Sequence, residues 1–143
     1  MTHDPYRLDR FIEAQEGDYE NALEEIRAGR KRSHWMWYVF PQFTGLGSSP
    51  TSAHYAIKSR EEAKQYLAHP VLGRRLVECA EAVLGIDNRS AHEIFGSPDD
   101  VKLRSSATLF ASVSPDGSVF QQIVDKYFEG NSDVRTMELM SRA

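Results

Sequence analysis

Several features that would assign this chain to a class of protein at once are scarce in its sequence. Cysteine occurs once, as Cys79, so no internal disulfide can form and a reducing compartment is expected. Five histidines lie singly and far apart, which is not the spacing of a structural metal site. The sequence therefore predicts no metal and no cofactor. It also favours a buried packing role for Cys79, which lies in an apolar helical stripe.

Long hydrophobic runs are also missing. The first ten residues are polar and charged, unlike a secretory signal peptide. Residues 33–57 contain no Asp, Glu, Lys or Arg, but prolines and glycines interrupt them and hydroxyl residues fill their second half. We therefore expect a cytoplasmic protein that makes no contact with a membrane.

The motifs of several common catalytic classes begin here but are not completed. His92 and Glu93 start like the helix of a zinc protease, yet Gly96 stands where the second histidine belongs. GLGSSP starts like a dinucleotide-binding loop, but Pro50 replaces its third glycine. A P-loop and a nucleophile elbow are absent. The sequence thus declares no activity, and whether the protein is an enzyme stays open.

What the sequence does contain is typical of a mainly α fold. Its 143 residues, 41% hydrophobic and 27% charged, suit a single compact domain spanning 1–143. Capping residues followed by apolar residues three and four apart predict about seven helices. The starts are Asp4, Asp18, Ser59, Pro70, Ser90, Ser97 and Asp133, and one more apolar stripe runs from Phe120 to Phe128. Residues 34–40, HWMWYVF, form either a short helix after Ser33 or an irregular aromatic segment packed between helices.

Charge is distributed unevenly along the chain, whose net charge is −4. Residues 1–26 carry a net −6 and residues 76–143 a net −5, whereas residues 27–75 carry a net +7. A basic middle between acidic ends either pairs internally or attracts an anionic small molecule. Nucleic acid is a poor match, because the protein is acidic overall, with a pI of about 5.7, and lacks a sustained basic face.

The run GRKRSHWMWYVFPQ places cations directly before aromatic residues. Arg30 and Lys31 could hold a phosphate, and Trp35 or Trp37 could stack on a flat ring. Gln42 could recognise the edge of a base or a ribose hydroxyl. The alternative is that the aromatic residues are core and the cations form a solvated corner. The two interpretations differ in whether these residues line one pocket.

A second group of candidates lies on the helix that follows Ser97. Lys102 and Ser105 could face the same pocket. Asp99 would then be the best-placed carboxylate for general acid–base chemistry, with His34 as the other catalytic candidate. The alternatives are that Ser105 bonds the carbonyl four residues earlier and that His34 is structural.

Four stretches resemble a known family: LDRFIEAQ, GRKRSHWMWYVFPQ, YAIKSREEAKQYLAHPVLGRRL and GSPDDVKLRSSATLF. Together they are similar to the bacterial family called domain of unknown function 1810, from about Tyr6 to Met140. The resemblance implies a mainly helical fold and no settled activity. Some members of that family carry the name calpastatin, but calpastatin-type inhibitors are disordered, whereas this composition is that of a globular protein.

A looser likeness is to the compact, helix-rich N-glycosidases that act on ADP-ribose and related phosphoribosyl compounds. It rests on an aromatic segment near the N-terminus and polar residues between helices, and no catalytic residue is carried over. The working hypothesis is a site for a phosphorylated, nucleotide-like or ADP-ribose-like small molecule, with N-glycosidic hydrolysis as the candidate reaction. The alternative is a non-enzymatic protein-interaction module whose basic segment docks an acidic surface.

Overall fold

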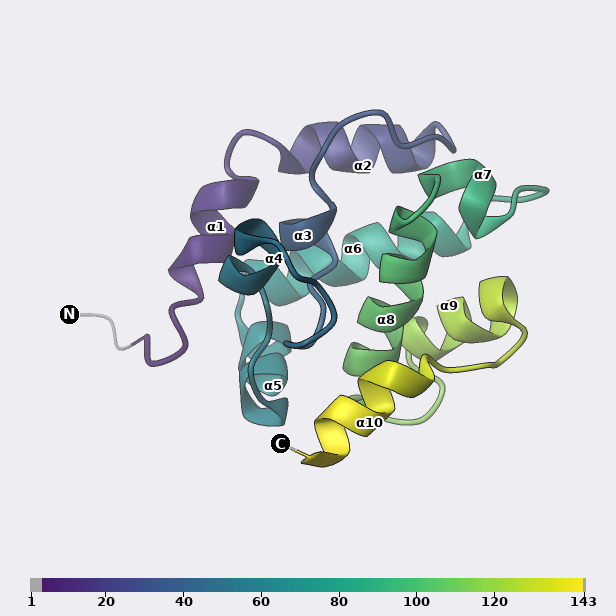
Figure 1. The fold of residues 1–143 in the computed structure, drawn as a ribbon. Helices are drawn as coiled ribbons and strands as arrows, with labels where there is room; N and C mark the ends of the chain where they lie inside the picture. The colour runs from purple at the N-terminus through teal and green to yellow at the C-terminus, as the bar shows by residue number, and fades with distance from the viewer. Residues whose placement is uncertain (1–3, 143) are drawn as a thin grey trace.

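Helices account for nearly all the regular structure of the chain, as the computed structural model of residues 4–142 shows (Figure 1). Within that range ten helices follow one another, and the only strand-like pairing is an isolated bridge between Phe43 and Ile57. The helices are α1 (Asp9–Gln15), α2 (Tyr19–Arg27), α3 (Met36–Val39), α4 (Pro50–His54), α5 (Arg60–Ala68), α6 (Leu72–Leu84), α7 (Ala91–Phe95), α8 (Asp99–Ser112), α9 (Val119–Phe128) and α10 (Val134–Arg142). The prediction of a mainly α, single-domain fold is confirmed.

Side-chain caps set several helix starts locally. The Ser59 hydroxyl accepts a hydrogen bond from the Glu62 N–H at 3.0 Å where α5 begins. Ser90 and Glu93 bond each other's N–H groups reciprocally at the start of α7. Ser118 caps α9 by accepting a hydrogen bond from a backbone N–H three residues on. The predicted starts at Ser59 and Ser90 are confirmed.

The first helix starts later than the sequence predicts. Arg7 has a φ of 53°, in the left-handed region, so α1 begins at Asp9 rather than directly after Asp4. The Asp4 carboxylate still satisfies the start of the helix, because its two oxygens accept hydrogen bonds from the N–H groups of Leu8 (2.9 Å) and Asp9 (3.1 Å).

The long helix α8 lies at the centre of the packing. It contacts α5, α7, α9 and α10, while α6 packs against α2, α5 and α9 (Figure 1). Three of the seven buried residues of α8 carry hydroxyl groups. Ser105 and Thr108 donate hydrogen bonds to the carbonyls of Val101 (3.1 Å) and Arg104 (2.8 Å), four residues earlier. The helix can therefore be buried on most sides without being wholly apolar.

The aromatic segment contains a short helix, α3, which begins directly after Trp35. Four residues of the segment belong to the main core: Trp35, Met36, Val39 and Phe40. Trp37 and Tyr38 are half-buried instead. The segment is thus part core and part surface, a division that the sequence alone leaves open.

Residues 42–57 fold back on themselves next to this segment. The Thr44 N–H donates to the Ile57 carbonyl and the Ile57 N–H donates to the Gln42 carbonyl, both at 2.9 Å. The closed loop carries α4, which Ser49 caps and Pro50 opens. This helix is not among those expected from the sequence, because α4 has no apolar stripe and none of its residues is buried.

Across residues 4–142 no helix is both long and apolar enough to cross a membrane. The same residues contain no group of three His, Cys, Asp or Glu side chains placed to hold a metal ion. Cys79 is buried in the core, and burial raises the pKa of its thiol to about 12.

Candidate ligand-binding cleft

Glu25, on α2, fixes the backbone that leads into the aromatic segment. Its Oε1 accepts hydrogen bonds from the N–H groups of Arg32 (2.6 Å) and Ser33 (2.9 Å) and from the Trp35 indole N–H (3.0 Å). Its Oε2 accepts one from the Ser33 hydroxyl at 2.6 Å. Burial alone raises the pKa of Glu25, but the hydrogen bonds outweigh it and lower the pKa to about 2. Trp35 is fully buried, so its ring packs in the core and faces no open space.

Lys31 and Asp99 form an internal ion pair rather than a binding surface. Lys31 Nζ lies 2.8 Å from Asp99 Oδ2 and 4.9 Å from the centroid of the Trp35 ring, and the lysine side chain is only 6% exposed. The pair ties the segment before α3 to the start of α8. Arg30 and His34 point to solvent, as their exposure shows. Five candidates from the sequence thus lie outside the cleft described next: Arg30, Lys31, His34, Trp35 and Asp99.

The other four predicted ligand contacts lie together in a cleft of about 520 Å³. Trp37 and Gln42 reach it from α3 and the segment after it, and Lys102 and Ser105 reach it from α8. The loop of residues 46–49 and the start of α10 complete its walls. Residues 60 or more positions apart in sequence therefore meet here through the packing of α8 beside the closed loop.

Lys102 is held over the face of the Trp37 ring. Its Nζ lies 4.7 Å from the ring centroid and 3.4 Å from Asp99 Oδ1. Because Asp99 also pairs with Lys31, one carboxylate lies between two cations, and this wall of the cleft keeps an excess of positive charge. The Lys102 side chain is 22% exposed, so an anion in the cleft can reach its ammonium group.

The start of α10 supplies a further wall of the cleft, with two residues that are not among the sequence candidates, Asp133 and Arg135. Asp133 Oδ2 accepts hydrogen bonds from the Thr136 N–H (3.0 Å) and the Thr136 hydroxyl (2.5 Å), which cap α10. It also lies 3.3 Å from the Ser105 hydroxyl, whose one hydrogen it shares with the Val101 carbonyl, so that α10 is joined to α8. Arg135 also lines the cleft, and its NH1 lies 3.6 Å from Glu138 Oε2. The sequence marks Asp133 as a helix start, but only the contact of α10 with α8 places it beside Ser105.

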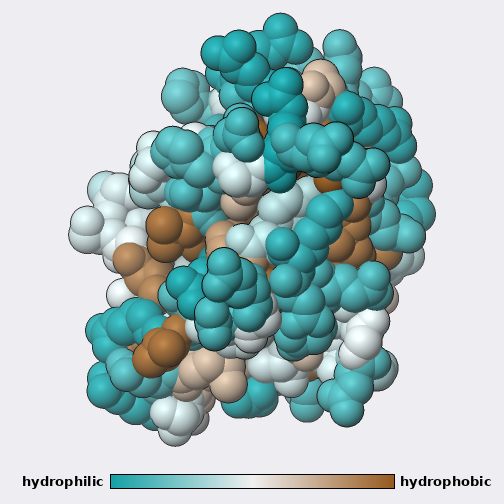
Figure 2. All heavy atoms as spheres, turned by 90° about the vertical axis from the view of Figure 1, so that its right-hand side faces the viewer, coloured by the Kyte–Doolittle hydropathy of each residue, from teal (hydrophilic) through white to brown (hydrophobic). Residues whose placement is uncertain are grey.

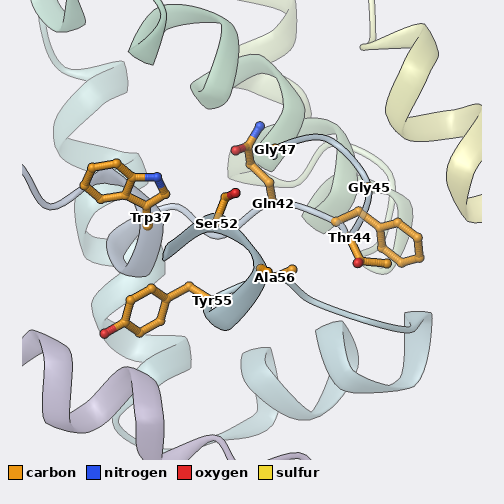
Figure 3. A pocket seen from close by; sticks show the side chains of 10 residues that line it. Trp37, Gln42, Thr44, Gly45, Gly47, Ser52, Tyr55 and Ala56 are labelled. Carbon is orange, nitrogen blue, oxygen red and sulfur yellow. The ribbon is translucent and has the colours of Figure 1, made fainter. Parts of the chain in front are cut away.

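A smaller hollow of about 240 Å³ adjoins the cleft (Figure 3). Trp37, Gln42, Gly47 and Ser52 line both spaces, so the two meet along these residues. Gly47 lies so close to α4 that a Cβ added to it would come within 2.4 Å of Ser52 Oγ. A side chain at position 47 would therefore clash with Ser52 unless one of the two shifts.

A third hollow, of about 420 Å³, is lined in part by a buried arginine that serves the fold. It lies beside Arg10, whose five N–H donors are all used within the protein. The acceptors are the carbonyls of Tyr6, Arg7, His54 and Ala56 and the Glu62 Oε2, which is 2.6 Å away. Arg10 is 7% exposed, so it acts as a buried tie between α1, α4 and α5 rather than as a ligand contact.

Fold and cleft together define an all-α single-domain protein with a groove between its loop 42–57 and α8, lined by apolar side chains and by a few charged and polar ones. The chain belongs to the family described as "Protein of unknown function (DUF1810)", whose model matches residues 5–140. The resemblance seen in the sequence is therefore confirmed.

One solved structure is similar over almost its whole length: the crystal structure of the conserved hypothetical protein Rv1873 from Mycobacterium tuberculosis. The two share 51% sequence identity with a TM-score of 0.95, over 96% of this chain and 99% of that chain. A comparison with curated proteins finds no match. The family and the solved structure thus establish the fold and leave the activity to be argued from the cleft.

Proposed function

We propose that the protein binds a phosphorylated, nucleotide-like small molecule in the cleft beside Trp37 and Lys102. The observation that carries the proposal is the placement of an aromatic face and a partly exposed cation on one wall of a cleft of about 520 Å³. Small-molecule sites are typically clefts of roughly 300–1,000 Å³ that combine apolar surface with a few polar groups. ADP-ribose is the largest ligand of this class that we include.

The charges around the cleft favour a phosphate near Lys102. Lys102 and Arg135 line the cleft, against one lining carboxylate, that of Asp133. One oxygen of Asp133 is already engaged by Thr136 and Ser105, which disperses its charge. A phosphate between Lys102 and Arg135 would gain charge-assisted hydrogen bonds of the kind that are strongest in proteins. The net +7 of residues 27–75 is the reason to expect an anionic ligand from the sequence. Of those residues, Lys31 affects the cleft indirectly: it pairs with Asp99, so the Asp99 carboxylate neutralises Lys102 only in part.

Hydrolysis of an N-glycosidic bond is the reaction to test first. It needs a carboxylate that can take a proton from water. Asp99 is held between two lysines outside the cleft, and His34 is exposed elsewhere, so neither sequence candidate suits this role. Asp133 lines the cleft, and its Oδ1 makes no hydrogen bond to the described part of the chain. In this reaction water would add to the ribose C1′, its proton would pass to Asp133, and the base would leave with the bonding electron pair.

Calorimetric titration and thermal unfolding test the binding step. The ligands are AMP, ADP-ribose and inorganic phosphate, and the proteins are wild type, Lys102→Met and Lys64→Met. Lys64 is an exposed lysine of α5 and serves as the matched control for loss of one positive charge. At about 100 times its dissociation constant a ligand stabilises the folded state by roughly 2.7 kcal/mol. We expect that stabilisation with AMP or ADP-ribose in wild type and Lys64→Met, and at least about tenfold weaker binding in Lys102→Met.

Chromatography of released base tests the reaction separately. Asp133→Asn keeps a helix-capping side chain but removes the base, so it should bind ligand and release nothing. Base release by wild type that persists in Asp133→Asn would reject this role for Asp133. Equal affinity of wild type and Lys102→Met for every ligand would reject the binding proposal itself.

The non-enzymatic alternative has one observation in its favour. Three large apolar side chains are exposed on α8 and α10, the helices beside the cleft: Val101, Val134 and Met137. Figure 2 shows hydrophobic side chains scattered over a face that is otherwise mostly hydrophilic. A protein-interaction module predicts that no small molecule in the panel binds. It also predicts concentration-dependent association in sedimentation experiments that Met137→Glu abolishes.

A further inference from the structure

Polar side chains in the smaller hollow lack partners within the described chain. The Trp37 indole N–H, the Gln42 side-chain amide and the Thr44 hydroxyl all line it, and none of them makes a hydrogen bond to residues 4–142. The other tryptophan and the other glutamines do make such bonds within the described chain. The Trp35 indole donates to Glu25 at 3.0 Å, and the Gln15 amide donates to the Tyr38 carbonyl at 2.7 Å. The fold therefore leaves hydrogen-bonding groups of three neighbouring side chains open in this hollow.

The walls of the hollow suit a flat ring. In Figure 3 the rings of Trp37 and Tyr55 lie on one side and Thr44 lies on the other, with Ser52 and Gln42 between them. Tyr55 is fixed by its neighbours, because its ring centroid lies 5.3 Å from that of Tyr38. An immobile aromatic wall stacks on a ring at little entropic cost.

The polar groups of the hollow are also fixed in place. The Gln42 carbonyl accepts the Ile57 N–H, and the Thr44 N–H donates to the Ile57 carbonyl, so the backbone on both sides of Phe43 is closed. Ser52 is held by Ser49, whose carbonyl accepts its hydroxyl at 2.9 Å. The Gln42 side chain thus extends from a rigid backbone and lines both the hollow and the cleft.

We propose that the smaller hollow is the subsite for a nucleobase, which stacks beside Trp37 and presents an edge with an adjacent donor and acceptor to the Gln42 amide. This inference rests on the proposed function, because the phosphate of the same molecule then lies in the cleft near Lys102. An amide offers one acceptor and two donors, so it pairs with such an edge through two hydrogen bonds. The Thr44 hydroxyl supplies a further donor or acceptor on the far side.

The test compares ligands that differ only in the base or only in the phosphate. AMP, adenosine and ribose 5-phosphate are titrated into wild type, Gln42→Leu and Gln122→Leu. Gln122 lies exposed on α9, so its substitution controls for loss of one amide far from the cleft. We expect AMP to bind at least about tenfold more tightly than ribose 5-phosphate, since stacking of one base is worth that much. The difference should shrink in Gln42→Leu and persist in Gln122→Leu.

The indole N–H signal of Trp37 in the NMR spectrum tests directly whether a base lies beside its ring. The chain has two tryptophans, so its NMR spectrum contains two indole N–H signals. AMP and adenosine should shift the signal of Trp37 and leave that of buried Trp35 in place, whereas ribose 5-phosphate should shift neither strongly. Assignment follows from Trp37→Phe, which removes one signal and keeps an aromatic wall.

The outcomes separate this inference from the proposed function. Equal affinity for AMP and ribose 5-phosphate, both weakened in Lys102→Met, would overturn the nucleobase subsite and leave the phosphate site standing. Binding of adenosine as tight as AMP, unaffected by Lys102→Met, would keep the subsite and reject the phosphate site. An AMP titration that moves the Trp35 signal but not that of Trp37 would overturn the subsite outright.

Discussion

Lys102 Nζ and the Trp37 ring lie 4.7 Å apart at the place where the two hollows meet. A cation this close to an aromatic face gains roughly 0.5–2 kcal/mol, depending on how far water is excluded. Lys102 is also 3.4 Å from Asp99, which Lys31 holds from its other side. The lysine is therefore positioned before any ligand arrives, and an incoming anion meets a preoriented charge beside a flat apolar surface.

This arrangement predicts that ligand binding depends on salt through Lys102. Raising the ionic strength from about 0.01 M to 0.15 M shortens the Debye length from about 30 Å to 8 Å and weakens attraction between partly exposed charges. We expect AMP affinity to fall several-fold over this range in wild type and in Lys102→Arg, which keeps the charge. Lys102→Gln should bind weakly at both salt concentrations with a flatter dependence. Calorimetric titrations at the two ionic strengths measure the effect, and an equal salt dependence in Lys102→Gln would contradict it.

Helices are predictable from the sequence where a capping residue is followed by an apolar stripe. Ser59 and Ser90 precede apolar stripes, and their hydroxyls cap α5 and α7 as expected. α4 is the exception. Ser49 and Pro50 set its start locally, but the helix has no buried residue and therefore no apolar stripe. The closure of Gln42 and Thr44 on Ile57, which holds the loop around it, joins positions too far apart for a local pattern to reveal.

Only part of the candidate site is predictable from the sequence, because contacts between distant residues determine the rest. Trp35 and Trp37 lie two positions apart in one aromatic run, and no local pattern shows which of them is buried. Glu25 makes the difference between the two rings, because its carboxylate accepts a hydrogen bond from the Trp35 indole in the core, whereas Trp37 lies at the cleft. Asp133 and Arg135 enter the cleft only because α10 packs on α8, a contact that sequence spacing does not encode.

Arg10 should be far more important for stability than its neighbour Arg7. All five of its donors are used in a buried setting, and lysine offers only three donors on a compact head group. Breaking a buried ion pair of this kind costs about 3–5 kcal/mol. We therefore expect Arg10→Lys to lower the free energy of unfolding by a few kcal/mol in urea titrations. Arg7 pairs with Asp9 at the surface, so Arg7→Lys should stay close to wild type. Equal effects of the two substitutions would show that the network around Arg10 is not held as described.

Glu25 should make stability depend on acid pH. Its pKa falls from the ordinary 4.5 to about 2 in the folded protein, since the Ser33, Arg32 and Trp35 hydrogen bonds outweigh the cost of burial. A group whose folded pKa is lowered stabilises the folded state above its unfolded pKa and loses that contribution as pH falls through the folded value. The contribution should thus be complete above pH 4.5 and disappear towards pH 2, with a size of roughly 3 kcal/mol.

Denaturant titrations of wild type and Glu25→Gln between pH 2 and 7 measure this contribution. The difference between the two proteins should be largest near neutral pH and narrow below pH 4.5, where the wild-type carboxylate begins to lose its advantage. Glu24→Gln, at the exposed neighbouring position, controls for the loss of one negative charge. A constant difference between wild type and Glu25→Gln across this range would contradict the assignment of the lowered pKa to Glu25.

Gly73 tests the close approach of α5 and α6. Alanine is the better helix former by about 1 kcal/mol, so propensity alone predicts that Gly73→Ala stabilises α6. A Cβ at this position, however, would lie 2.0 Å from the Leu67 carbonyl oxygen, which belongs to backbone and cannot rotate away. Overpacking of this kind costs about 1–3 kcal/mol or more, so the clash should win and the substitution should lower the midpoint of unfolding. Gly17→Ala is the matched control, because nothing lies within 4 Å of its added Cβ and it should be neutral or slightly stabilising. Stabilisation by both substitutions would contradict this prediction. It would mean that α6 can move away from Leu67 and that α5 and α6 are not packed as closely as the contact of Gly73 with Leu67 indicates.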